Sequence, residues 1–90
     1  MNKACLLCYV EGRVQGVFYR DATRKKAKEL GLTGWVKNLS DGRVQVMMCG
    51  ELAGVEELRN WLWDGSPAAD VTDVVVEEVA WEDYEDFEVR

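Results

Sequence analysis

Residues 4–30 read ACLLCYVEGRVQGVFYRDATRKKAKEL and contain three successive secondary-structure signals. Side chains alternate in character from Ala4 to Val14, which predicts a strand that Gly12 interrupts near its end. A short glycine-containing loop follows. After Asp21 the chain is rich in Ala, Lys, Arg, Glu and Leu, which favour a helix, and Gly31 is a natural stop for that helix. The stretch therefore predicts a strand, a loop and a helix.

The next segment predicts a β-hairpin. Residues 32–39 return to extended character, and residues 43–49 alternate Val and Met with Gln, Met and Cys. Between them, Ser40, Asp41 and Gly42 form a turn signal. We therefore expect two antiparallel strands joined at an Asp-Gly tip.

The last part of the chain predicts a second helix and one or two strands. Residues 51–63 place apolar side chains at helical spacing, and Gly-Ser-Pro at 65–67 ends that helix. Residues 71–81 are rich in Val and predict a strand, in which the adjacent Glu77 and Glu78 indicate a bulge or an exposed edge. Residues 87–89 form a short final strand in this interpretation.

The order strand, helix, strand, strand, helix, strand is typical of the split βαβ arrangement. It predicts a ferredoxin-like α+β sandwich, βαββαβ, in which two helices cover one face of an antiparallel sheet. A chain of 90 residues with 48% apolar residues and one Pro is expected to form one domain over residues 1–90 and to be a stable monomer.

The charge of the chain is unevenly distributed. The formal net charge is −6 at pH 7, yet residues 1–50 carry 9 basic and 4 acidic side chains, whereas residues 51–90 carry 2 and 13. A basic half can attract a small anion, while the overall field repels a long polyanion such as RNA. Solubility is an equally simple explanation of the acidic half.

Several classes of function are disfavoured by what the sequence lacks. It contains no His, the commonest general base and metal ligand, and three Cys alone do not complete a conventional zinc site. Any chemistry is therefore expected to use groups other than His or a zinc site of Cys and His. No apolar run reaches the roughly 18 residues of a membrane span, and residues 1–8 lack the core of a secretory signal, so a cytoplasmic protein that binds no membrane is expected.

A candidate anion site lies in residues 12–20, which read GRVQGVFYR. They join a strand to a helix, where free backbone N–H groups and the helix dipole favour an anion. Gly16 allows successive N–H groups to converge, and the guanidinium of Arg20 can grip two phosphate oxygens. The alternative is that the glycines only permit a tight turn and that Arg20 is a surface charge.

The second candidate is Asn38, at the end of the strand before the hairpin turn. Its amide can both donate and accept hydrogen bonds. In a split βαβ unit the first two strands are parallel and flank the third, so Asn38 and Arg20 can converge at one edge. The alternative is a turn residue that caps its own hairpin. The neighbouring Lys37 is expected to project to the opposite face.

Together, GRVQGVFYR at 12–20 and GWVKNLSDG at 34–42 closely resemble the two signature stretches of the acylphosphatase family. This resemblance implies an enzyme that hydrolyses acyl phosphates, with Asn38 orienting the attacking water. It also implies that the substrate phosphate, or inorganic phosphate as product or inhibitor, binds to Arg20 and to the loop amides of Gln15, Gly16, Val17, Phe18, Tyr19 and Arg20. No metal or cofactor is implied.

Two functions from other classes remain as alternatives. A ferredoxin-like module can bind nucleic acid on its sheet, but the chain lacks a basic, aromatic-rich strand and its pI is about 4.6. A non-catalytic ligand-binding domain of the same fold is the second alternative, and the presence of Asn38 argues against it.

The three cysteines are expected to differ in role. Cys5 and Cys8 should point to opposite faces of the first strand, with Cys8 in the core. Cys5 and Cys49 should meet on neighbouring antiparallel strands, on the face away from the helices. They could form a disulfide under oxidising conditions, although cytosolic thiols are usually reduced.

Overall fold

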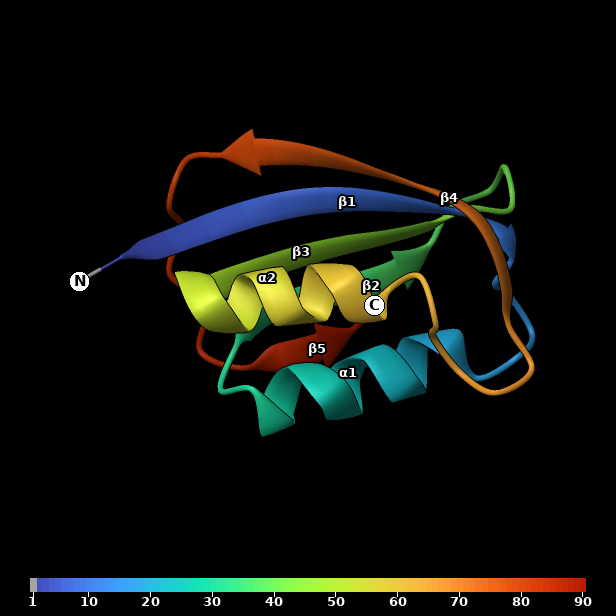
Figure 1. Cartoon of the computed structure of the whole chain (residues 1–90), viewed down its shortest axis with the longest axis horizontal. Helices are drawn as coiled ribbons and strands as arrows, with labels where there is room; N and C mark the ends of the chain where they lie inside the picture. The colour runs from blue at the N-terminus through green and yellow to red at the C-terminus, as the bar shows by residue number, and fades with distance from the viewer. Residues whose placement is uncertain (1) are drawn as a thin grey trace.

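The computed structural model describes residues 2–90 as five strands and two helices (Figure 1). In chain order these are β1 (Lys3–Arg13), α1 (Tyr19–Glu29), β2 (Thr33–Asn38), β3 (Val44–Glu51), α2 (Leu52–Trp61), β4 (Asp70–Val79) and β5 (Phe87–Val89). The predicted order of elements is confirmed. Neither helix in this part of the chain is long and apolar enough to cross a membrane.

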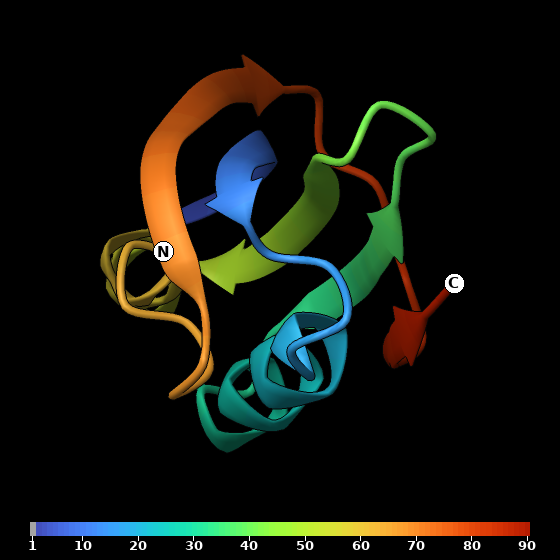
Figure 2. The same cartoon turned by 90° about the vertical axis from the view of Figure 1, so that its right-hand side faces the viewer.

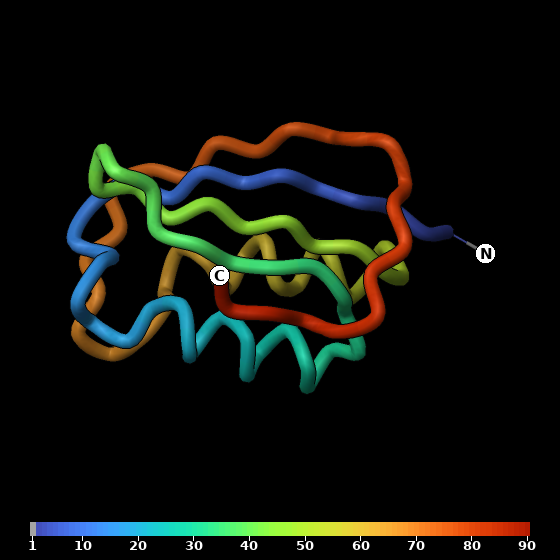
Figure 3. Tube along the Cα trace, turned by 180° about the vertical axis from the view of Figure 1, so that it is seen from behind, coloured from blue at the N-terminus to red at the C-terminus, as the bar shows by residue number. Residues whose placement is uncertain are grey.

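The strands form one sheet in the order β4-β1-β3-β2-β5, and Figure 3 shows them as neighbouring rows of the tube. β1 pairs antiparallel with β3 and β4, and β2 pairs antiparallel with β3. The split βαβ core of the prediction is thus confirmed. The short strand β5 departs from the expected antiparallel pattern, because it pairs parallel to β2, with Val36 opposite Val89. The sheet is therefore mixed.

The core lies between the helices and one face of the sheet (Figure 1). Every second residue of β1 faces it, and Cys8 and Val10 are fully buried there. α2 buries Val55 and Leu58 against this face. Since the side chains of a strand alternate between faces, the residues between these positions belong to the opposite, helix-free face.

The irregularity of the sheet lies near the start of β4, where Thr72 is an extra residue opposite β1, and not at Glu77 and Glu78. The pairing of β1 with β4 shifts between Glu11 and Gly12, and Gly12 has φ 121°. A side chain at Gly12 would collide with the backbone of Asp70, so glycine is needed where the two strands come close. Glu77 and Glu78 pair regularly with β1, and their exposure reflects the position of β4 at the edge.

A disulfide joins Cys5 and Cys49 on the helix-free face. The two residues lie directly opposite each other in the β1–β3 pair, with their Cα atoms 4.1 Å apart. Both are buried, because the segment after β4 crosses over them and brings the carbonyl oxygen of Glu82 to 3.9 Å from Cys5 Sγ. Cys8 is a free thiol on the core side.

Candidate active site

The loop between β1 and α1 and the β2–β3 turn lie at the same end of the molecule, on the right in Figure 1 and toward the viewer in Figure 2. This follows from the topology, because β1 and β2 run in the same direction on either side of β3. β1 and β2 therefore both finish at this end of the molecule. Two segments that are distant in sequence can therefore share one site.

The loop backbone is curled so that its amides are free. Gly16 has φ 75° and Phe18 has φ 63°, and the first helical bond runs from the N–H of Ala22 to the carbonyl oxygen of Phe18. Within residues 2–90, no backbone or side-chain acceptor is paired with the N–H groups of residues 15–20. These donors and the N-terminal end of the helix dipole together favour an anion.

The helix begins earlier than expected, at Tyr19 rather than after Asp21. Phe18 provides the transition, because its left-handed backbone conformation turns the chain from the loop into the helix. Such a conformation in a residue with a Cβ costs about 1 to 2 kcal/mol. As a result, Arg20 lies in the first helical turn and is carried by a regular element.

Two side chains tie the loop to its surroundings, and the sequence did not indicate either role. Gln15 Nε2 donates hydrogen bonds of 2.8 and 2.9 Å to the carbonyl oxygens of Leu39 and Arg43, which bracket the hairpin turn. Ser66 Oγ donates a 2.7 Å bond to the carbonyl oxygen of Val17. The loop is thus attached to the hairpin on one side and to the segment after α2 on the other.

Tyr19 anchors the start of α1 in the core. Its hydroxyl donates a 2.6 Å hydrogen bond to the carbonyl oxygen of Leu62, and its ring packs 6.1 Å from that of Trp61, centroid to centroid. Burial raises the pKa of Tyr19 above its usual value. The phenol is therefore a neutral structural group at physiological pH.

Asn38 is the last residue of β2 and lies on the same face as the buried Val36, toward the helices. Its side-chain Oδ1 is buried and has no hydrogen-bond partner among the described residues. Buried polar atoms are nearly always paired, so this oxygen is suited to a ligand or a water molecule. Lys37 points the other way, with Nζ 5.3 Å from the centroid of the Trp35 ring.

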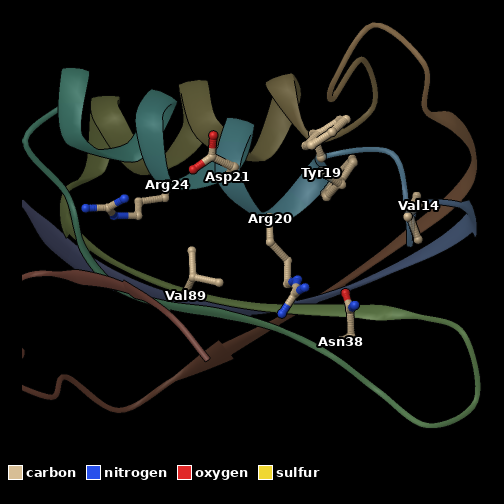
Figure 4. Close-up of a pocket in the computed structure, with 9 residues that line it drawn as sticks. Val14, Tyr19, Arg20, Asp21, Arg24, Asn38 and Val89 are labelled. Carbon is tan, nitrogen blue, oxygen red and sulfur yellow. The ribbon is translucent and has the colours of Figure 1, made fainter.

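Arg20 and Asn38 face each other across a cavity of about 440 Å³ (Figure 4). The guanidinium of Arg20 points from α1 toward the carboxamide at the end of β2. Arg20 Nη1 also donates a 3.2 Å hydrogen bond to the main-chain oxygen of Arg90, which follows β5. The charged groups of the lining are two guanidinium groups, Arg20 and Arg24, and one carboxylate, Asp21. The net charge of these three side chains is positive.

The cavity contains most of the candidate residues and some that were not expected. Gly16, Phe18, Tyr19, Arg20 and Asn38 line it, whereas Gln15 and Val17 do not. The side chain of Gln15 turns to the hairpin and that of Val17 is buried. The unexpected lining residues are Val14, Asp21, Arg24 and Val89. Helical spacing relates Arg24 to Arg20, but no sequence signal indicated Val89, because β5 reaches the site through its pairing with β2 and its packing against α1.

A family model and curated relatives show the family of this chain. The family model described as Acylphosphatase matches residues 7–89. A curated acylphosphatase from Coxiella burnetii (strain Dugway 5J108-111) is 54% identical over 89 residues, which cover 99% of this chain and 94% of the relative.

Solved structures show the same relationship. An acylphosphatase structure from Coxiella burnetii superposes with a TM-score of 0.96 at 54% identity, covering 99% of this chain and 94% of that one. The crystal structure of acylphosphatase from Bacillus subtilis gives a TM-score of 0.93 at 34% identity, with coverages of 96% and 97%.

Proposed function

This chain belongs to the acylphosphatase family, and from that membership we propose which of its residues bind and hydrolyse the substrate. The activity is the hydrolysis of the carboxyl–phosphate bond of an acyl phosphate to a carboxylate and inorganic phosphate. The observation that carries the assignment of roles is the buried Oδ1 of Asn38, which has no partner within residues 2–90 and lies in the same cavity as Arg20.

The phosphoryl group binds to the backbone N–H groups of residues 15–20 and to the guanidinium of Arg20. The free amides of this loop and the positive lining of the cavity support this role. Preorganised N–H donors stabilise charge on the phosphoryl oxygens without having to reorganise during the reaction. Inorganic phosphate, the product, occupies the same donors and acts as an inhibitor.

Asn38 positions the attacking water. Its Oδ1 accepts a hydrogen bond from that water, which places the nucleophile between the end of β2 and the phosphorus. An amide oxygen is too weak a base to take the proton, so the proton passes to a phosphoryl oxygen. Catalysis in this scheme depends on position and on electrostatic stabilisation, the two contributions that dominate phosphoryl transfer in general.

The leaving group needs little assistance. It departs as a carboxylate, whose conjugate acid has a pKa of about 4, so protonation by a general acid is unnecessary. The scheme therefore uses neither a metal nor a cofactor, and hydrolysis should persist in the presence of a chelator.

We also propose the oligomeric state and the cellular location of the enzyme. Residues 1–90 act as a single acylphosphatase domain and as a monomer in the cytoplasm, on a small-molecule substrate and without binding a membrane or nucleic acid. The formal charge of −6 supports the exclusion of polyanions. Size-exclusion chromatography with light scattering at working concentration tests the monomer, and a dimer mass would reject it.

The decisive experiment measures benzoyl phosphate hydrolysis in EDTA for the wild type and for Arg20 and Asn38 variants. The expected result is metal-independent turnover that both substitutions lower, together with competitive inhibition by inorganic phosphate. Turnover that survives in either variant at the wild-type rate would reject the proposed roles.

A further inference from the structure

Phe18 has an unusual position for a large apolar side chain. It is 83% exposed, the highest value among the large apolar residues found on the described surface. It belongs to the phosphate-binding loop, and it lines the cavity that contains Arg20 and Asn38. An exposed ring gains nothing from burial in the core, so packing within this chain does not explain its presence.

The backbone at Phe18 makes the position more specific. Phe18 is the one residue other than glycine with a positive φ in residues 2–90, and its side chain is exposed at the residue that precedes α1. Glycine would adopt this conformation without strain, and Gly16 does so two residues earlier. The chain therefore maintains a strained backbone while it presents an aromatic ring at the mouth of the site.

The geometry of the reaction indicates what meets this ring. In an in-line displacement, the water and the leaving group lie on opposite sides of the phosphorus. The water is held by Asn38 Oδ1, a buried atom of a residue that lines the cavity. The acyl group consequently extends toward the open side, where Phe18 and the 42% exposed Val89 offer apolar surface.

We propose that Phe18 is a specificity-determining residue whose ring receives the acyl group, so that the enzyme prefers acyl phosphates with aromatic or bulky apolar acyl groups. This inference rests on the proposed function, because it requires the phosphate to sit in the loop. Stacking or edge contact between two rings strengthens binding beyond simple area burial. An acetyl group is too short to make the same contact.

The test compares benzoyl phosphate with acetyl phosphate for the wild type, Phe18→Leu and Phe18→Ala. Both replacements keep a Cβ, so the backbone constraint is the same in all three proteins. The ratio of kcat/KM for benzoyl phosphate to kcat/KM for acetyl phosphate is expected to fall about three- to tenfold in Phe18→Ala and less in Phe18→Leu. A change of this size corresponds to the binding free energy of one aromatic pair. Trp63→Ala, which removes another exposed aromatic outside the cavity, should leave the ratio unchanged.

A binding measurement separates recognition from chemistry. Phenylphosphonate and methylphosphonate share one anionic head group, and the preference for the phenyl compound as an inhibitor should fall in Phe18→Ala by a similar factor. If Phe18→Ala lowers turnover of both substrates equally and leaves the inhibitor preference intact, the inference is wrong while the proposed function stands. If the wild type hydrolyses neither acyl phosphate, the proposed function itself is wrong.

Discussion

Ser66 donates a 2.7 Å hydrogen bond to the carbonyl oxygen of Val17, in the middle of the loop that carries the free amides. Ser66 is 2% exposed and lies after α2, far from the loop in sequence. The bond connects the segment after the second helix to the phosphate-binding loop. Because an oriented carbonyl at Val17 also orients the next peptide N–H, the loop geometry depends on this contact.

Replacing Ser66 with Ala should therefore affect both stability and binding. The carbonyl of Val17 would lose its partner in a buried setting, which costs about 1 to 3 kcal/mol. The free energy of urea unfolding should fall by that amount, and KM should rise because the loop is less ordered. Ser40→Ala, at an exposed turn position, is the matched control and should change neither quantity. Equal stability of Ser66→Ala and the wild type would contradict the role of this bond.

Arg20 is expected to act on both binding and turnover. Its guanidinium contacts the phosphoryl group in the ground state and in the transition state, so Arg20→Gln should raise KM and lower kcat together. The combined loss in kcat/KM should be about 10²- to 10³-fold, as for the removal of one strong oxyanion donor. Arg20→Lys keeps the positive charge but loses the planar guanidinium with its paired N–H donors. It should therefore recover only part of the activity. Full recovery by Lys would show that charge alone suffices.

Asn38 is expected to act mainly on turnover. Because its Oδ1 meets the water rather than the substrate, Asn38→Ala should lower kcat by about 10²-fold and leave KM within about twofold. Lys37→Ala, on the opposite face of the same strand, should retain wild-type kinetics. The measurement is a steady-state comparison with benzoyl phosphate, and a near-normal kcat for Asn38→Ala would exclude the water-positioning role.

The disulfide between Cys5 and Cys49 should contribute measurably to stability. It links residues 44 positions apart, and a cross-link across a loop of this length stabilises the folded state by about 2 to 4 kcal/mol. The midpoint of urea unfolding should therefore decrease after reduction with dithiothreitol. The Cys5→Ala and Cys49→Ala double variant should be no more stable than the reduced protein, because it also loses two buried sulfur atoms, and it should not respond to the reductant. A gain of two mass units on reduction, measured on the intact chain, verifies the bond itself.

Cys8 should make the protein less stable at alkaline pH. Burial raises the pKa of this thiol from 9.0 to about 12. The unfolded chain therefore loses the thiol proton at lower pH than the folded chain does, so the free energy of unfolding falls as pH rises from about 9 toward 12. Tyr19, whose pKa is also raised by burial, acts in the same direction.

The check on Cys8 is a series of unfolding curves between pH 8 and 10.5 for the wild type and Cys8→Ala. The variant leaves a small cavity and is less stable overall, but its stability should decline less steeply with pH. Identical slopes would show that the thiol remains protonated in both states. In addition, Cys8 should react with a thiol reagent only after unfolding.

Much of the fold was predictable because it depends on local periodicity. The alternation of Leu6, Cys8 and Val10 placed the strand and its core face correctly. The element boundaries were less predictable at α1, where composition indicated a start after Asp21 while the chain enters the helix at Tyr19. Nothing in the composition of residues 15–19 indicated that Phe18 would adopt a left-handed conformation.

By itself, the sequence determined the strand–helix order, the presence of a glycine loop before a helix, and the topology that places residues 20 and 38 at one edge. These features depend on neighbours within a few positions and on a small set of allowed connections between strands. The tertiary structure alone decided that Ser66 holds Val17, that Gln15 bridges to the hairpin, and that β5 brings Val89 to the cavity beside β2. Such contacts join segments that are distant in sequence. They depend on tertiary packing, which leaves no periodic pattern in the sequence.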